Sequence, residues 1–134
     1  MERVCVYCAS SSKINPIYFE TAEKLGKIFA NNNTELIYGG GSVGLMGKLA
    51  DTIMDAGGKV TGVIPRFMCE VEWQHNGISD LVITETMHER KEKMATLADA
   101  VVALPGGCGT IEELMEVITW KQLGSFNKPI VILN

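Results

Sequence analysis

The chain has 134 residues, of which 46% are hydrophobic and 21% charged, and its formal net charge is −4. This length suits one domain that buries a core without disulfides, and an acidic chain without a basic run is not expected to bind nucleic acid. No apolar run approaches the roughly 18 residues of a membrane span, and charged residues at the start interrupt any signal-peptide core. We therefore expect a cytoplasmic protein without a membrane partner.

The first half of the chain alternates strands, turns and helices. Asn15 followed by Pro16 is typical of a helix start, with Asn as the N-cap and Pro at the first helical position. A pair of glycines, Gly57 and Gly58, is expected to end the second helix. The predicted strands are Arg3–Ala9, Glu35–Tyr38 and Lys59–Ile64, and the predicted helices run from Pro16 to about Ala30 and from about Leu45 to Ala56.

The second half repeats this pattern after an irregular loop with a short helical turn over Arg66–Gly77. Strands are predicted at Leu81–Thr84, Ala100–Leu104 and Pro129–Leu133, and helices at Met87–Leu97 and Thr110–Leu123. Apolar strands separated by helices predict a parallel sheet that is covered on both faces. The fold class is therefore α/β, a Rossmann-like doubly wound parallel sheet in a three-layer α/β/α arrangement, with residues 1–134 as one domain.

The four cysteines are not expected to form a metal site or a disulfide. Cys5 and Cys8 lie within one predicted strand, where residues three apart point to opposite faces. His75 and His88 are far apart in the sequence. Reduced thiols are also the normal state in the cytoplasm.

The first glycine-rich turn, Gly39-x-Gly41-x-x-Gly44, follows a strand and opens a helix. It matches the dinucleotide-binding fingerprint, but the next strand ends at Gly62–Pro65 without the acid that would bind a ribose. The sequence does not match a phosphate-binding Walker loop either, because Leu49 stands where Ser or Thr should bind magnesium. We expect Gly41 and Gly44 to contribute to a backbone cradle for a small anion or a sugar edge.

The second glycine-rich turn, Pro105–Glu113, reads PGGCGTIEE. Glycines at a strand exit let backbone N–H groups approach an oxyanion, and the helix dipole adds positive potential. Thr110-x-x-Glu113 is also a capping box, so a purely structural role is the alternative. Two adjacent acids beside an anion site would repel the anion, which suggests that one of them faces a cationic, oxocarbenium-like centre.

The segment Met87–Lys91 places Arg90 and Lys91 near the start of a helix. Positive charge there opposes the helix dipole. One interpretation is a guanidinium fork with a lysine point charge on a phosphate or ribose, and the other is a solvated surface pair.

Taken together, these motifs resemble those of the Lonely Guy family, the cytokinin riboside 5′-monophosphate phosphoribohydrolases. That family has PGGxGTxxE preceded by M-x-x-R-K, which stand here as PGGCGTIEE and MHERK, and the resemblance runs the whole length of the chain. It implies a homodimer that hydrolyses the base–ribose bond of a nucleoside 5′-monophosphate without a cofactor. Family members continue some tens of residues beyond Asn134, so this chain is expected to be shortened at its C-terminus.

The resemblance also assigns site residues. It implies that Arg90 and Glu113 are catalytic. Because the second glycine-rich turn is expected to bind an anion, we also expect that phosphate or sulfate can occupy the site. The resemblance implies that substrate is bound by Glu72, Lys91, Gly106, Gly107, Cys108, Gly109, Thr110, Ile111 and Glu112. Gly41 and Gly44 of the first glycine-rich turn are added to these substrate-binding residues because that turn is expected to form a backbone cradle.

Two other functions remain as alternatives. One is a plain AMP nucleosidase, and the other is a non-catalytic carrier of a nucleotide or of the molybdenum cofactor. The pair Arg90 and Glu113 favours an enzyme, because a carrier needs no acid at an anomeric carbon. Relatives often bear the label lysine decarboxylase, but no lysine that would carry pyridoxal phosphate is identifiable here.

Overall fold

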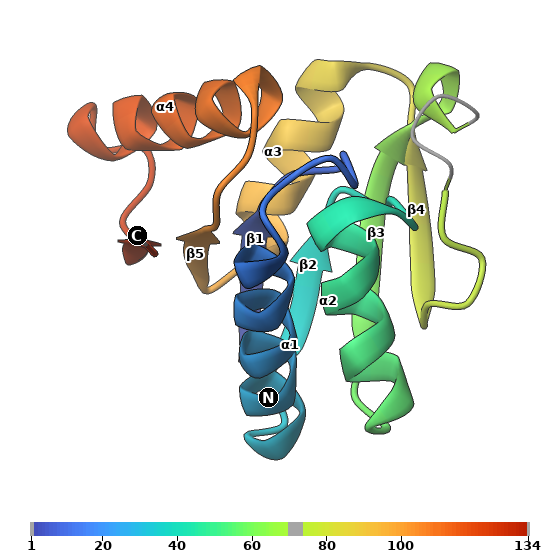
Figure 1. Cartoon of the computed structure of the whole chain (residues 1–134). Helices are drawn as coiled ribbons and strands as arrows, with labels where there is room; N and C mark the ends of the chain where they lie inside the picture. Colours follow the sequence, from blue (N-terminus) through green and yellow to red (C-terminus); the bar gives the residue numbers. More distant parts are fainter. Residues whose placement is uncertain (1, 70–73, 134) are drawn as a thin grey trace.

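Strands and helices alternate along the chain in a computed structural model that describes residues 2–69 and 74–133 (Figure 1). The strands are β1 (Arg3–Tyr7), β2 (Glu35–Tyr38), β3 (Val60–Pro65), β4 (Asp80–Thr84), β5 (Ala100–Ala103) and β6 (Ile130–Ile132). The helices are α1 (Pro16–Asn31), α2 (Gly44–Asp55), α3 (Met87–Leu97) and α4 (Cys108–Gln122), with a 3₁₀ turn η1 (Arg66–Met68) after β3. Within the described residues, no helix is both long and apolar enough to cross a membrane.

The strands form one six-stranded sheet in the order β4-β3-β2-β1-β5-β6. Each neighbouring pair of strands is parallel. The predicted Rossmann-like doubly wound sheet is therefore confirmed.

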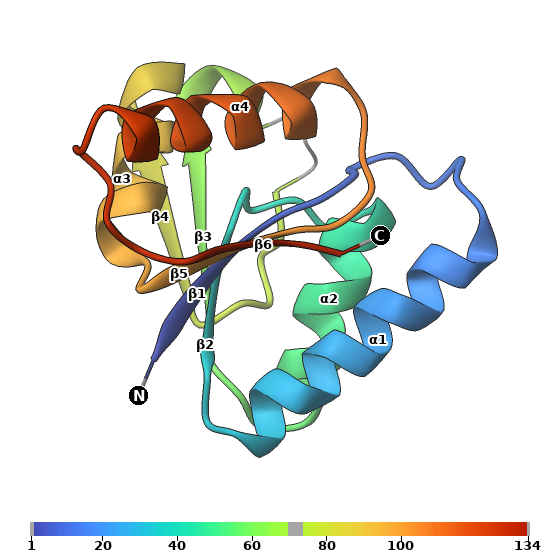
Figure 2. The ribbon, with the colours of Figure 1, turned by 90° about the vertical axis from the view of Figure 1, so that its left-hand side faces the viewer.

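Two hydrophobic clusters hold the helices on the sheet, one on each face. Helices α1 and α2 pack on the cluster that contains Val6 and Cys8, and α3 and α4 pack on the cluster that contains Cys5 and Tyr7. Figure 2 shows α1 and α2 together on one side of the sheet. The expectation that Cys5 and Cys8 point to opposite faces is confirmed.

The strand order reverses between β1 and β5. From β1 the chain moves outward through β2, β3 and β4, and α3 then returns it to β5 on the other side of β1. The loops after β1 and β5 stay close, because Leu104 N donates to Tyr7 O at 2.8 Å and Ala9 N donates to Pro105 O at 3.1 Å. Ligands of such sheets bind where these carboxyl ends meet.

Helix α4 begins at Cys108, and not at Thr110 as the sequence suggested. Gly107 is its N-cap, in an extended conformation and without a side-chain cap. Glycine serves as an N-cap almost as well as threonine, so the helix can begin directly after Gly107. Because Thr110 lies inside the first turn, the capping-box alternative for Thr110 and Glu113 is wrong.

Candidate functional site

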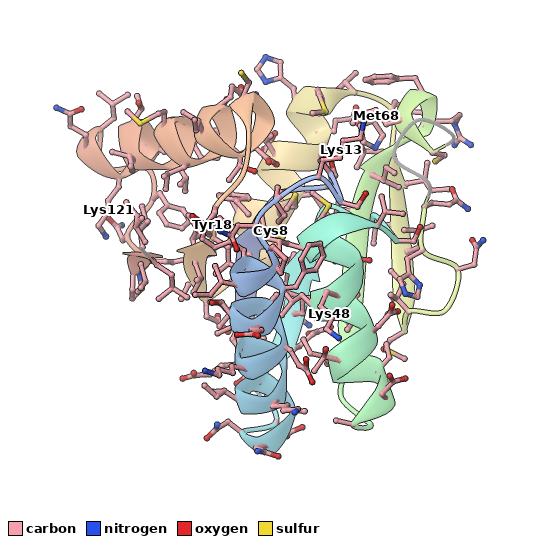
Figure 3. All side chains as sticks on the ribbon, viewed as in Figure 1. Cys8, Lys13, Tyr18, Lys48, Met68 and Lys121 are labelled. Carbon is pink, nitrogen blue, oxygen red and sulfur yellow. The ribbon has the colours of Figure 1, made fainter. Side chains whose placement is uncertain are left out.

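A cavity of about 320 Å³ opens at the carboxyl ends of the strands, where β1 and β5 meet. Figure 1 shows that α3 and α4 both start at this end of the molecule, and Figure 3 shows Cys8 at the end of β1. The cavity is lined by Cys8, Ala9, Ser10, Ser11, Met46, Met68, Met87, Arg90, Gly107, Cys108, Gly109, Thr110, Glu112 and Glu113. The topology therefore brings together segments that are far apart in the sequence.

Arg90, in the first turn of α3, is a buried cation with only 2% of its surface exposed. Its Nε donates to Val63 O at 2.9 Å and its Nη2 donates to Gly39 O at 2.7 Å. These two bonds to the ends of neighbouring strands fix the plane of the guanidinium. The remaining nitrogen, Nη1, approaches the sulfur atoms of Met68 and Met87 at 3.9 and 3.8 Å. Thioethers are weak acceptors, so this edge keeps hydrogen-bonding capacity for a ligand in the cavity.

The first glycine-rich turn accommodates Arg90. A Cβ atom on Gly39 would overlap Nη2 of Arg90, and it would meet Cε of Met46 at 3.0 Å. A glycine is therefore required here so that a side chain from α3 can reach the backbone after β2.

Gly41 and Gly44 do not line the cavity, although the sequence suggested that they bind substrate. Gly41 O accepts a hydrogen bond of 2.7 Å from the hydroxyl of Tyr38. Gly44 has a positive φ of 66°, and a Cβ atom there would collide with the backbone of Ser10. The turn thus packs tightly against Arg90 and the loop after β1, and the assignment of Gly41 and Gly44 to the substrate stays a prediction.

The N-terminus of α4 supplies the positive end of the cavity. Ile111 N bonds back to Gly107 O at 3.1 Å, so the N–H groups of the preceding three residues have no acceptor one turn earlier within the helix. These residues, Cys108, Gly109 and Thr110, line the cavity. Such amides, together with the helix dipole, bind phosphate-like anions.

Two residues of the second glycine-rich turn do not line the cavity, although the sequence suggested that they bind substrate. Gly106 lies outside the lining, and a Cβ atom there would overlap the Thr110 hydroxyl. Ile111 also lies outside it and is 57% exposed. Gly106 therefore allows Thr110 to pack, while the assignment of Ile111 to the substrate stays a prediction.

Glu113 lies one turn further along α4 and is 7% exposed. After burial itself, the negative charge of Glu113 is the next largest cause that raises the pKa of the Cys5 and Cys8 thiols. Glu113 lines the same cavity as Arg90 and as Cys8, which follows β1. A buried acid and a buried base in one cavity are typical of a functional site.

Lys91 connects α3 to α4. Its Nζ is 2.6 Å from Glu112 Oε1 and 2.6 Å from Glu116 Oε2, and its side chain is 12% exposed. These hydrogen bonds raise the pKa of Lys91 above its ordinary value. Lys91 is not part of the cavity lining, so its assignment to a phosphate stays a prediction. The two carboxylates explain how α3 accommodates a lysine near its N-terminus.

Replacing Lys91 with methionine is expected to lower the free energy of unfolding by about 1–2 kcal/mol, because Glu112 and Glu116 then face each other without a cation. Lys93→Met, which changes an exposed lysine of the same helix, is the control and should have a much smaller effect. Urea unfolding measures both. Because the pKa of Lys91 is raised in the folded state, the difference should be complete at pH 7–9 and shrink only above about pH 10.4. Equal stabilities of the two variants would contradict this role.

Several lining residues were not identified from the sequence. Ser10 and Ser11 follow β1, and the doubly wound fold itself predicts that this strand exit reaches the ligand. Met46, Met68 and Met87 give no comparable signal, because apolar residues of this kind are usually part of a core. Glu72, which was expected to bind substrate, lies outside the described residues.

A protein-family model described as "Possible lysine decarboxylase" matches residues 46–134. A cytokinin riboside 5′-monophosphate phosphoribohydrolase of Arabidopsis thaliana is 46% identical over 132 residues, which are 98% of this chain and 62% of the relative. An enzyme of the same name from Rhodococcoides fascians is 47% identical over 98% of this chain and 67% of its own length. Among eight such relatives, this chain spans 54% to 67% of their length.

Solved structures with the same fold include carriers of the molybdenum cofactor. The carrier of Chlamydomonas reinhardtii is 25% identical and superposes with a TM-score of 0.79, covering 98% of this chain and 75% of that one. A molybdenum cofactor binding protein of Rippkaea orientalis is 23% identical with a TM-score of 0.79, covering 99% and 76%. At 23% identity, the similarity to the Rippkaea orientalis protein shows a shared fold alone.

Proposed function

Because this chain belongs to the Lonely Guy family of cytokinin riboside 5′-monophosphate phosphoribohydrolases, we propose that it hydrolyses the N-glycosidic bond of a nucleoside 5′-monophosphate. The products are the free base, of the cytokinin or adenine type, and ribose 5-phosphate. One observation carries this proposal. Arg90 and Glu113, both almost fully buried, line one cavity together with the N-terminus of α4.

The phosphate is bound at the start of α4. The N–H groups of Cys108, Gly109 and Thr110 are available there, and Thr110 adds a hydroxyl. Inorganic phosphate or sulfate would use the same groups.

Arg90 orients the ribose phosphate. Two of its nitrogens are bound to the backbone, so Nη1 meets the ligand from a fixed direction. A preorganised group of this kind contributes to turnover as well as to affinity, because it holds the sugar in reactive geometry.

Glu113 acts at the anomeric carbon. As the C1′–N bond breaks, its electron pair leaves with the base and positive charge develops on the sugar. A buried carboxylate stabilises that charge strongly, because water does not screen it. Glu113 then either activates the water that attacks C1′ or attacks C1′ itself. In the second route, water hydrolyses the resulting ester bond between Glu113 and C1′, so both routes end in ribose 5-phosphate. The base takes up a proton, and no electrons are transferred to a cofactor.

The protein is expected to hydrolyse 5′-monophosphates far better than the corresponding nucleosides. Without the phosphate, the substrate loses several charge-assisted hydrogen bonds, each worth about 1.5–3 kcal/mol. Part of this binding energy holds the ribose in place, so turnover should fall together with affinity. Free base released from AMP and from adenosine is measured by chromatography, with inorganic phosphate as a competitor. Equal rates at subsaturating concentration would show that the phosphate site is wrongly assigned.

We also propose that the protein is a cytoplasmic homodimer, as in the family. The family description names a lysine decarboxylase, but the described residues that line the cavity include no lysine for a Schiff base with pyridoxal phosphate. This supports the hydrolase over the decarboxylase.

Two alternatives differ from this proposal in testable ways. A plain AMP nucleosidase would show the same chemistry without a preference for modified adenines. A carrier of the molybdenum cofactor is supported by the likeness to the Chlamydomonas protein, and it would bind its ligand without releasing a base.

A further inference from the structure

Cys108 is the exposed cysteine of the proposed active site. It is the first residue of α4, it lines the cavity, and its side chain is open to solvent. The glycines on either side of it leave the approach free, since a Cβ atom on Gly107 or on Gly109 would meet nothing within 4 Å. Cys108 also occupies the variable position of the motif PGGxGTxxE.

A second observation, on Arg90, supports a polar ligand in the same cavity. Arg90 is 2% exposed and lines the cavity, and its Nη1 lies 3.9 and 3.8 Å from the thioether sulfurs of Met68 and Met87. A buried guanidinium edge with such weak acceptors favours an anionic group in the cavity. Glu112 and Glu113 also line the cavity, so the positive potential that an acidic molecule meets beside Cys108 comes from Arg90 and from the amides at the start of α4.

The other three thiols are less accessible. Cys5 and Cys8 are buried, and burial raises the pKa of both thiols. Cys69 is partly buried, and its thiol donates to Pro65 O at 3.7 Å. Since the thiolate is the reactive form, modification should be selective for Cys108.

We propose that Cys108 is a redox-modification site that closes the cavity to substrate when it forms a mixed disulfide with an acidic low-molecular-weight disulfide. The thiolate of Cys108 attacks one sulfur of that disulfide, a new S–S bond forms, and the original S–S bond breaks. The leaving thiolate takes up the proton that Cys108 lost, and the small disulfide is the oxidant. A small thiol reverses the exchange. The regulatory effect rests on the proposed function, because it is the phosphate position at the start of α4 that the adduct would fill.

The test treats the whole protein with glutathione disulfide and identifies the modified peptide by mass spectrometry. Hydrolysis of AMP is measured before and after treatment, and each variant is compared with its own untreated rate. We expect the adduct on Cys108 and a fall of at least about tenfold, the loss expected for one charge-assisted hydrogen bond. Dithiothreitol should restore the rate. Cys69→Ser should remain sensitive, whereas Cys108→Ser should become insensitive.

Ligand protection tests the site independently of catalysis. AMP at ten times its dissociation constant should slow modification of Cys108 by about tenfold, because it occupies the cavity. If the untreated protein releases no base, the proposed function fails, while this protection still tests the location of Cys108. Modification of Cys69 in preference to Cys108, equal rates with and without AMP, or full activity of the adduct would each overturn the inference.

Discussion

Replacing Glu113 with glutamine is expected to lower turnover of a nucleoside 5′-monophosphate by about 10²–10³-fold, the usual effect of removing one group that stabilises a transition state. Glutamine keeps the size and most of the polar contacts of Glu113, but it removes the negative charge that faces the anomeric carbon. Nucleotide affinity should change little, because the phosphate is bound by the start of α4. Single-turnover kinetics and equilibrium binding of AMP measure the two effects separately.

The control for this substitution is Glu92→Gln, which neutralises an exposed acid on α3 outside the cavity. It should keep wild-type turnover. If the carboxylate of Glu113 only supported the fold, its loss would reduce the free energy of unfolding by about 1 kcal/mol and leave activity intact. Near-normal turnover of Glu113→Gln would therefore remove Glu113 from the mechanism.

Replacing Arg90 with alanine should raise the Michaelis constant and lower turnover together, and reduce kcat/KM by at least about 10²-fold, because one guanidinium both binds and orients the substrate. Arg90→Lys should recover little of this. A lysine ammonium cannot bond the carbonyls of Val63 and Gly39 while presenting a third nitrogen to the cavity.

Stability distinguishes this role from a structural one. Arg90→Ala leaves two buried carbonyls without their donor and should lower the free energy of unfolding by about 1–3 kcal/mol. Arg66→Ala, in which an exposed arginine loses its 3.0 Å ion pair with Glu85, is the control for charge and should keep full activity. Full activity in Arg90→Ala would mean that Arg90 serves the fold alone.

Local sequence signals predicted much of the fold because their causes are local. Asn15 caps α1 as expected, with its side chain accepting from Ile17 N at 3.0 Å. The apolar runs predicted the strands of the parallel sheet, and the glycine-rich turns indicated the edge at which the strands end. The predicted start of α4 was wrong because threonine is a common N-cap residue and Thr110 was taken as the cap. In the structure the N-cap is Gly107, which has no side chain that could cap the helix.

The candidate site depends on contacts that local patterns do not contain. Arg90, Glu113 and the start of α4 line one cavity, and the sequence motifs suggested that these residues lie together. The requirement for Gly39 comes from a side chain 51 residues away, and the partners of Lys91 lie on a different helix. The packing of Gly39 and Gly44 therefore depends on residues that lie far away in the sequence, and the glycine pattern by itself does not contain this information.

The central claim is that this cavity breaks a base–ribose bond, and the most direct measurement is product release. The protein is incubated with a panel of nucleoside 5′-monophosphates that includes AMP and adenine nucleotides with apolar substituents on the base. Free base and ribose 5-phosphate are then quantified by chromatography, with Glu113→Gln as the matched control. We expect base and ribose 5-phosphate to appear in equal amounts and the Glu113→Gln control to release almost none. Binding of the nucleotides without release of base from any of them would contradict the account and leave a carrier.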